Sequence, residues 1–160
     1  MDRLWTPWRY RYISRAEPTD GCIFCIKAAE NRDADNYIVY RGRLNFVLLN
    51  LFPYTNGHLM IAPYAHVAIL AATAADTLSE MMQLVQRAEV NLREAYHPHG
   101  FNLGMNIGES AGAGVAGHIH MHVLPRWTGD ANFMSTIGET RVLPEELPVT
   151  YEKLVKLAWG

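Results

Sequence analysis

Residues 106–127 read Asn106-Ile-Gly-Glu-Ser-Ala-Gly-Ala-Gly-Val-Ala-Gly-His118-Ile-His120-Met-His122-Val-Leu-Pro-Arg-Trp127. The three histidines alternate with apolar residues, which is the period of a β-strand whose successive side chains point to opposite faces. We therefore expect all three imidazoles on one face of a strand over 118–124, with neighbours about 6.5–7 Å apart. Imidazole has an unperturbed pKa of about 6.5, so it is largely neutral and nucleophilic near pH 7. Such a residue suits covalent catalysis at phosphorus.

The segment before the histidines contains four glycines between residues 108 and 117. Glycine tolerates positive φ and allows backbone N–H groups to approach a ligand closely, so such a loop can bind anionic oxygens. We expect a phosphate to lie between this loop and the histidine strand. The alternative interpretation is a flexible connection that leads into a strand with exposed polar histidines.

Hydrophobic patterning predicts an α+β domain. Apolar residues recur at helical spacing from Asp76 to about Tyr96, which indicates one long middle helix with Met81 and Met82 in the core. Short helices are expected at 27–31 and, near the C-terminus, at 148–157. The sheet is expected to be antiparallel with about five strands, at 37–40, 44–50, 58–62, 101–107 and 118–124, and the turn before the third carries the Asn56-Gly57 signal.

Size and composition are those of one globular domain, which we place at residues 21–160. The chain has 160 residues, of which 49% are hydrophobic and 19% charged, and its net charge is −2. This charge gives no support for a nucleic-acid partner. No apolar segment approaches the roughly 18 residues of a membrane span, and no signal peptide is recognisable, so we expect a soluble, cytoplasmic protein without a membrane partner. Residues 1–20 interleave tryptophan and tyrosine with arginine, and we expect an arm that packs on its own domain or on a second subunit. The alternative is an arm whose rings stack on the bases of a ligand while its arginines contact phosphates.

The alternating histidines resemble the His-x-His-x-His signature of the histidine-triad (HIT) family. The continuation Pro125-Arg-Trp-Thr-Gly-Asp-Ala-Asn-Phe133 and the opening Leu4-Trp-Thr-Pro-Trp-Arg-Tyr-Arg-Tyr-Ile13 are similar to the branch that contains prokaryotic diadenosine tetraphosphate phosphorylases and related hydrolases. The resemblance implies a HIT-like fold, a homodimer, and cleavage of an adenine nucleotide or dinucleoside polyphosphate at the α-phosphate through a nucleotidyl-histidine intermediate.

The resemblance also implies roles for individual side chains. His120 matches the nucleophile, His122 the residue that binds the phosphate and assists the leaving group, and His58 the histidine that supports the triad. Asn50 matches the residue that holds the ribose hydroxyls. The other implied nucleotide-binding residues are Asn106, Gly112, Ala113, Gly114 and Val115 for the phosphate oxygens, and Phe46, Leu48 and Tyr37 for the base.

One position departs from the family pattern. Most members have Gln or Ser at or near the position of Gly114, where a polar group serves the bridging oxygen or the attacking phosphate, and glycine cannot supply it. The sequence therefore leaves two possible acceptors for the nucleotidyl group: water, as in a hydrolase, or inorganic phosphate, as in a phosphorylase.

The two cysteines of the chain, Cys22 and Cys25, have the spacing of half a tetrahedral zinc site. In a reducing compartment such a pair favours metal or redox chemistry over a structural disulfide. The resemblance implies that His66 and His118 complete a structural zinc site. The alternatives are two cysteines without a metal, or a thioredoxin-like redox pair, for which the surrounding βαβ unit is missing.

Two other functions are compatible with parts of the sequence. A zinc-stabilised nucleotide-binding or sensing module would use the same pocket without turnover, although a binder needs no nucleophile at His120. A catalytic metal held by His118, His120 and His122 is the other alternative, but the motif brings no carboxylate ligand with it.

Overall fold

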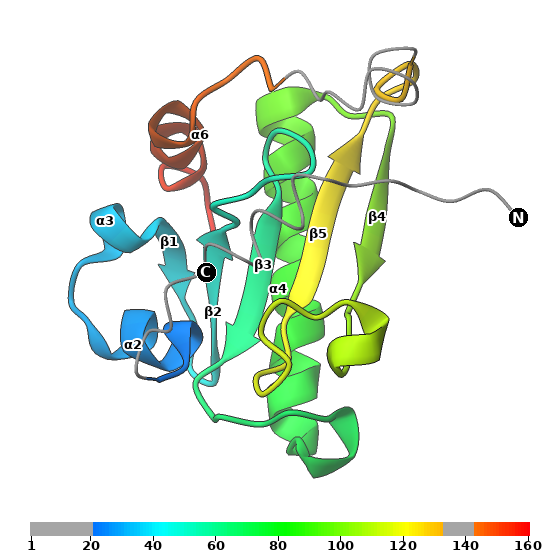
Figure 1. Cartoon of the computed structure of the whole chain (residues 1–160). Helices are drawn as coiled ribbons and strands as arrows, with labels where there is room; N and C mark the ends of the chain where they lie inside the picture. The colour runs from blue at the N-terminus through cyan, green and yellow to red at the C-terminus, as the bar shows by residue number, and fades with distance from the viewer. Residues whose placement is uncertain (1–20, 133–142) are drawn as a thin grey trace, which may run out of the picture.

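A computed structural model of the chain describes residues 21–132 and 143–160, so the predicted arm over residues 1–20 lies outside the described residues. The centre is a five-stranded sheet in the order β1-β2-β3-β5-β4, in which every neighbouring pair is antiparallel (Figure 1). This confirms the predicted α+β class and the predicted number of strands. The strands are β1 Ile38–Arg41, β2 Asn45–Leu49, β3 Leu59–Pro63, β4 Gly100–Gly104 and β5 Met121–Arg126.

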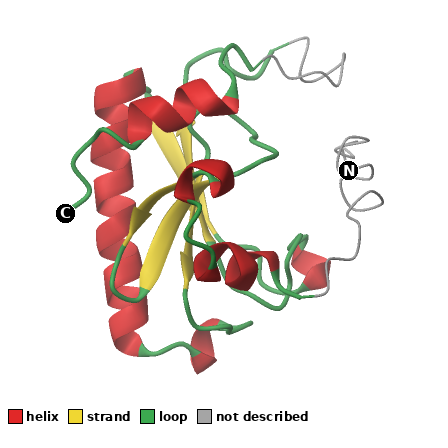
Figure 2. Ribbon diagram, turned by 90° about the vertical axis from the view of Figure 1, so that its left-hand side faces the viewer, coloured by secondary structure: helices red, strands yellow, loops and turns green. Residues whose placement is uncertain are grey.

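Helices cover both faces of the sheet. The long helix α4 (Ala75–Tyr96) lies along one face, as Figure 2 shows, and α6 (Leu147–Leu154) packs beside it. The short helices α2 (Ile23–Ala29) and α3 (Asp33–Asn36) lie beside β1, and α2 packs on the face opposite α4. Neither α4 nor any other helix within the described ranges has the length and apolar character of a membrane-spanning segment. The remaining helical turns are η1 (Leu70–Ala72) and η2 (Glu109–Ala111).

Strand alternation separates two apolar clusters, one on each face of the sheet. On β3, Leu59 and Ile61 are fully buried beneath α4, whereas Met60 and Ala62 face the cluster that contains Phe24 of α2. His122 of β5 lies opposite Met60 in the sheet register, and its neighbour Val123 belongs to the α4 core. The histidine side chain therefore projects from the α2 face of the sheet.

The predicted start of β5 at residue 118 is wrong, because the ladder begins at Met121. The backbone just before it makes other bonds: the N–H of Ile119 donates to the carbonyl of Val67 at 2.8 Å. The side chains nevertheless keep the predicted alternation, since Ile119 is buried between His118 and His120, which both contact Phe24.

Two helix predictions also need correction. The first helix begins at Ile23 rather than at residue 27, so its first turn contains Cys25. On α4, Met81 is buried at 1% exposure but Met82 is 49% exposed. Adjacent helical residues lie about 100° apart around the axis, and this rotation carries Met82 beyond the buried stripe of α4 that contains Met81.

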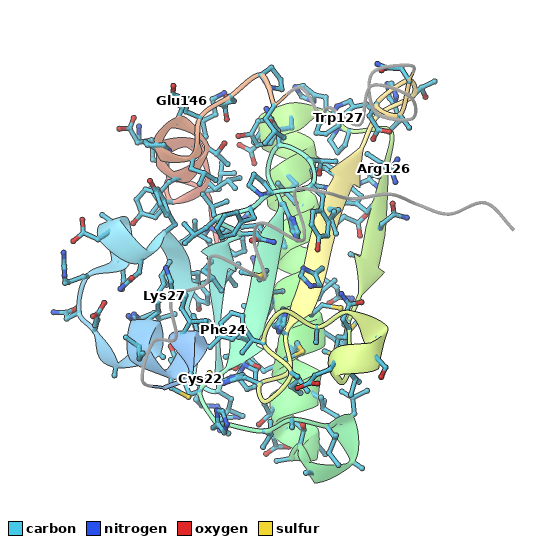
Figure 3. The ribbon with its side chains drawn as sticks, viewed as in Figure 1. Cys22, Phe24, Lys27, Arg126, Trp127 and Glu146 are labelled. Atoms are coloured by element: carbon cyan, nitrogen blue, oxygen red, sulfur yellow. The ribbon has the colours of Figure 1, made fainter. Side chains whose placement is uncertain are left out.

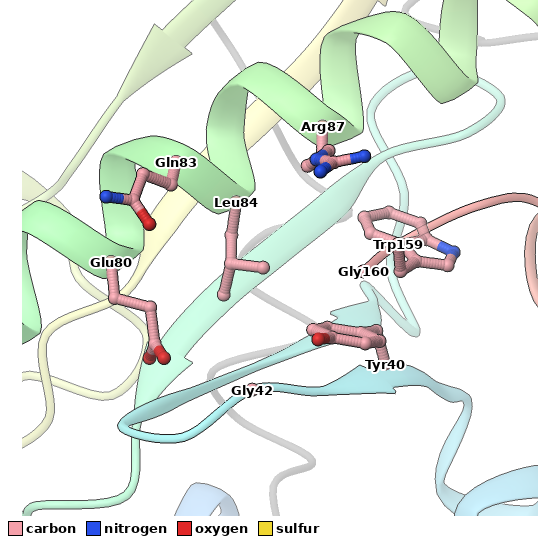
Figure 4. A pocket seen from close by; sticks show the side chains of 8 residues that line it. All are labelled: Tyr40, Gly42, Glu80, Gln83, Leu84, Arg87, Trp159 and Gly160. Atoms are coloured by element: carbon pink, nitrogen blue, oxygen red, sulfur yellow. The ribbon is translucent and has the colours of Figure 1, made fainter.

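A cavity of about 210 Å³ lies between α4, β1 and the C-terminal residues, with the stacked rings of Tyr40 and Trp159 at one side (Figure 4). At its other side the Glu80 carboxylate accepts hydrogen bonds from the N–H groups of Arg43 and Leu44 and from the Asn45 amide, at 2.7–2.9 Å. Burial raises the pKa of Glu80, but these hydrogen bonds outweigh burial and hold it below its ordinary value. The ionised carboxylate thus ties the β1–β2 turn to α4, on the face away from the histidines.

The turn before β3 depends on Gly57. Its φ is +72°, in the left-handed region, and a Cβ at this position would lie 2.8 Å from Cδ2 of Leu92 on α4. The Asn-Gly pair therefore does two things, since it reverses the chain and allows α4 to approach the residue that precedes His58.

Gly57→Ala is expected to destabilise the fold by about 2–4 kcal/mol, from backbone strain together with overpacking against Leu92. Chemical denaturation monitored by circular dichroism measures this change. Gly100→Ala is the matched control, because a Cβ at Gly100 would meet nothing within 4 Å. Equal stability of the two variants would contradict the role of Gly57.

Candidate active site and metal site

The three alternating histidines lie on the α2 face of the sheet and are all buried, at 1%, 5% and 8% exposure for His118, His120 and His122. The rings of His120 and His122 are in edge contact, with centroids 4.8 Å apart. His58, at the end of the Asn-Gly turn, places its ring centroid 5.0 Å from that of His122. The fold therefore brings the predicted catalytic histidines, His58, His120 and His122, into one cluster.

A hydrogen bond to the backbone determines which ring nitrogen of His120 carries the proton. Its Nδ1 lies 2.9 Å from the carbonyl oxygen of His118. A carbonyl can only accept, so Nδ1 carries the hydrogen, and in the neutral ring Nε2 keeps its lone pair. Burial lowers the pKa of His120, which favours the neutral ring near pH 7. Among the residues that the structure describes, no hydrogen bond occupies Nε2, so the arrangement presents a neutral imidazole with an available Nε2.

A second chain of hydrogen bonds orders His122. The N–H of Tyr54 donates to Nδ1 of His58 at 3.2 Å, so the proton of neutral His58 is on Nε2. That Nε2 lies 2.8 Å from Nδ1 of His122, to which it donates. His122 in turn carries its hydrogen on Nε2 and can donate it to an oxygen of a ligand.

The side chain of Asn50 lies next to His58, the first histidine in this series of hydrogen bonds. Its Oδ1 accepts the N–H of Phe52 at 3.0 Å, and its Nδ2 lies 3.4 Å from Nδ1 of His58. The amide therefore uses one lone pair for the loop after β2 and directs one N–H towards His58, and it can still offer a second N–H and a second lone pair.

The glycine-rich loop is folded partly on itself. The N–H of Gly112 donates to the backbone carbonyl of Glu109 at 2.8 Å, and the N–H of Ala113 donates to the backbone carbonyl of Gly108 at 3.4 Å. Both Gly108 and Gly112 have positive φ, 83° and 85°. Of the four amides expected to bind phosphate, those of Gly114 and Val115 make no hydrogen bond with the residues that the structure describes. The last predicted phosphate ligand, Asn106, is half-buried just before the loop.

The three residues expected to surround the base occupy other positions. Phe46 and Leu48 are fully buried in the cluster beneath Phe24, so they support the site from within the sheet rather than form an open wall. Tyr37 packs against the cluster on the α4 face and makes an edge contact with Tyr151 of α6. It does not belong to the histidine site. Its position could not be predicted from the strand pattern, because Tyr37 has a left-handed backbone, with φ 56°, and precedes β1.

The four residues predicted as metal ligands come together at the edge of the histidine cluster. One ligand atom from each of Cys22, Cys25, His66 and His118 lies within 4.8 Å of all the others. Nδ1 of His118 is 3.3 Å and 3.6 Å from the two sulfurs, and Nδ1 of His66 is 3.4 Å from Cys25. Zn–S bonds of about 2.3 Å and Zn–N bonds of about 2.0 Å would set tetrahedral ligand atoms about 3.3–3.8 Å apart. The donor set and its spacing fit a tetrahedral metal ion.

The surroundings of the cluster also fit a cation. Nε2 of His118 donates to the carbonyl of Pro63 at 2.8 Å, which leaves Nδ1 free as a ligand, in the arrangement common for metal-bound histidines. Burial, followed by the hydrogen bond and the charge of the neighbouring Cys22, raises the pKa of Cys25. A bound dication would reverse this effect at Cys25.

A family model for the HIT domain matches residues 31–129. The chain is also 38% identical over its full length to a Mycobacterium tuberculosis protein named AP-4-A phosphorylase, of which it covers 85%. The chain belongs to the HIT family. Among HIT structures, a zinc-bound histidine triad family protein from Mycobacterium smegmatis is 30% identical with a TM-score of 0.68, and the match covers 85% of this chain and 91% of that one. A histidine triad nucleotide-binding protein from Sulfolobus tokodaii, described as hypothetical, is 28% identical with the same TM-score, over 84% and 90% of the two chains.

The HIT histidines do not form a metal site of their own. Within residues 21–132 and 143–160, the only group of three or more potential ligands is the one that contains both cysteines. His118 points its Nδ1 at the cysteines, whereas His120 uses its Nδ1 for a carbonyl. The three imidazoles therefore do not converge on one ion, and the alternative of a catalytic metal on the triad is wrong.

Two residues that hold this HIT site together escaped the sequence analysis. Phe24, labelled in Figure 3, lies between the two cysteines on α2 and places its ring against His118 and His120. Arg41 of β1 donates to the carbonyls of Ala28 and Glu30 at the C-terminal end of α2, at 2.7 and 2.8 Å. The apolar residue inside the Cys-x-x-Cys pair was a usable signal for Phe24, but no sequence pattern identifies the partner of Arg41.

The hydrogen bonds predict the tautomers of the histidines. In nitrogen-15 NMR spectra near pH 7.5, His120 is expected to show a protonated Nδ1, and His58 and His122 a protonated Nε2. Single substitutions of each histidine assign the signals. An Nε2–H tautomer at His120 would contradict the orientation described here.

Proposed function

We propose that this HIT protein cleaves dinucleoside polyphosphates such as diadenosine tetraphosphate at the α-phosphorus, through a nucleotidyl intermediate on His120. The observation that carries the proposal is the hydrogen bond from Nδ1 of His120 to the His118 carbonyl, which leaves Nε2 as the free nucleophilic atom. The names of the relatives support the substrate class, since the 38% identical protein is called AP-4-A phosphorylase.

In the first step, Nε2 of His120 attacks the α-phosphorus. The new P–N bond forms as the P–O bond to the leaving nucleotide breaks, and diadenosine tetraphosphate releases ATP. The imidazole becomes positively charged in the intermediate, and the His118 carbonyl stabilises that charge through Nδ1–H. The Nε2–H of His122 donates to a phosphoryl oxygen, where negative charge develops.

In the second step, an acceptor attacks the same phosphorus and the P–N bond breaks. Water gives AMP, and inorganic phosphate gives ADP. We infer that phosphate is the acceptor here, because the relative that matches the full chain is named a phosphorylase. Product analysis with and without phosphate tests this directly, since only phosphorolysis gives ADP together with ATP.

We assign the other residues by their positions. His58 orients His122 through a 2.8 Å hydrogen bond. Asn50, next to His58, holds the ribose with the lone pair and N–H that the protein leaves free. The amides of Gly114 and Val115, with Asn106, bind phosphate oxygens, while Gly112 and Ala113 shape the loop through their internal hydrogen bonds.

We propose zinc as the metal of the cluster, with a structural role. The donor set of two cysteines and two histidines suits zinc, and the structural neighbour from Mycobacterium smegmatis is described as zinc-bound. When bound, zinc supplies a closed four-ligand crosslink between α2, the segment after β3 and the segment before β5.

We also propose a cytoplasmic homodimer built from a single domain over residues 21–160. The edge strand β4 supports an interface, because Leu103 on it is 48% exposed although apolar. A zinc-stabilised binding or sensing module remains the alternative function, and it differs from the proposal in having no turnover.

His120→Asn is expected to reduce turnover of diadenosine tetraphosphate by about 10⁴-fold or more, because the nucleophile is lost while the binding groups remain. His122→Ala removes one hydrogen-bond donor, so its loss is about 10²–10³-fold. Rapid-quench mass spectrometry of the wild type should detect an acid-labile nucleotidyl group on His120.

His97→Asn is the matched control for this substitution. His97 is exposed at the end of α4 with a left-handed backbone, φ 48°, which asparagine tolerates. Near-normal turnover of His120→Asn, with no adduct in the wild type, would rule out covalent catalysis at His120, whereas a wild type that binds the nucleotide without turnover would favour the binding module.

The second prediction of this function concerns the metal. The purified wild type should contain about one zinc per chain, and Cys22→Ser should lose it and unfold roughly 10 °C lower, because the binding energy of a structural metal contributes to folding. Elemental analysis and thermal unfolding measure the two effects. His97→Asn should keep both zinc and stability. If the wild type purified without chelator contained no zinc, the assignment of zinc to this cluster would be wrong.

A further inference from the structure

Phe24 joins the metal cluster to the nucleophile. It occupies α2 between the two predicted thiolate ligands, and its side chain is only 3% exposed. Its ring centroid lies 5.2 Å from that of His118 and 4.8 Å from that of His120, with tilted planes. One aromatic ring therefore touches both a metal ligand and the nucleophile.

His118 provides a second connection between the same two places. Its Nδ1 faces the two sulfurs, and its carbonyl oxygen accepts the Nδ1–H of His120. A movement of the His118 backbone would therefore displace the acceptor that determines the orientation of His120. The main chain of His118 and the ring of Phe24 both contact the His120 imidazole.

Helix α2 is anchored at its two ends by different groups. Arg41 binds the C-terminal carbonyls of α2 and pairs with Asp33 at 2.7 Å, independently of any metal. At the other end, Cys22 occupies the N-cap position but makes no side-chain capping bond, and its sulfur faces His118 instead. Because Phe24 lies in the first turn, its position depends on the end of the helix that the cysteines hold.

We propose that Phe24 is a positioning residue that transmits metal binding to the orientation of His120. With the cysteines bound to the metal, the first turn of α2 holds the Phe24 ring against the His120 imidazole. This contact blocks rotation of the imidazole, so that Nδ1 stays on the His118 carbonyl and Nε2 faces the substrate. The inference rests on the proposed role of His120 as the nucleophile.

Truncation of the ring gives the imidazole room to turn. In the turned orientation the free lone pair faces away from the substrate, and such misplacement lowers the rate of the chemical step more than the affinity for substrate. A ring that merely filled the core would change stability without a preference for one tautomer of His120.

The test compares Phe24→Ala and Phe24→Leu with Ile26→Ala, an apolar truncation on the same helix at a side chain that is 38% exposed. Zinc content should stay at about one per chain in all three, because no ligand is changed. In the Phe24 variants, the nitrogen-15 signals of His120 should show a mixture of tautomers or exchange broadening, and kcat should fall about 10–100-fold with KM within about threefold. Ile26→Ala should match the wild type in every measurement.

Chelation of zinc from the wild type should produce the same change in the His120 signals. Phe24→Leu keeps more of the side-chain volume, so it serves if Phe24→Ala does not fold. The proposal is overturned if both folded variants keep zinc and show wild-type His120 signals and kcat. It is also overturned if both variants lose zinc, since the ring would then support the cluster rather than the nucleophile.

Failure of this inference is distinguishable from failure of the proposed function. The NMR signals require no substrate, so they report the orientation of His120 even if the wild type turns over no dinucleoside polyphosphate. Conversely, normal wild-type turnover combined with unchanged signals in the Phe24 variants rejects Phe24 alone.

Discussion

The buried ring of His118 is the constraint on which the site depends, because three groups of this residue have separate partners. Nε2 donates to the carbonyl of Pro63, Nδ1 faces the two cysteines, and the main-chain carbonyl accepts the proton of His120. A buried polar group without a partner costs about 1–3 kcal/mol, so each of these contacts restricts where the residue can lie. The cysteine–histidine cluster and the proposed nucleophile, His120, consequently share one fixed point.

Hydrogen bonds between rings and to the backbone explain how four histidines can pack together in a largely apolar environment. Burial is the first cause that lowers the pKa of both His118 and His120, and neutral rings can alternate as donor and acceptor. The pair of His58 and His122 uses this alternation, with one ring donating to the next. In the proposed mechanism, positive charge develops on His120 when it bonds to phosphorus, and the His118 carbonyl already faces its Nδ1.

The two faces of the sheet differ in role, because one contributes most of the apolar core and the other holds the histidines. The α4 face is closed by a large apolar core that includes Leu59, Ile61 and Val123. The α2 face has a smaller apolar cluster and must accommodate the histidines, and there the contacts of Arg41, together with the proposed metal crosslink, hold a helix of seven residues in place. Short isolated helices are unstable, which is why α2 needs anchors at both ends.

Local patterns of the sequence were enough to predict the five strands and the long middle helix, although not the exact start of every element. The alternation at 118–122, the helical period through Met81 and the Asn-Gly turn each depend on side chains a few residues apart, which backbone geometry relates directly. The family resemblance added the candidate ligands, and the fold brought Cys22, Cys25, His66 and His118 together. Only the tertiary structure decided the tautomers, the engagement of Asn50 with His58, the inward hydrogen bonds of Gly112, and the contact of Phe24 with His120. These features depend on which backbone carbonyl or ring comes close after folding, and contacts between residues as far apart as 24 and 120 leave no periodic trace along the chain.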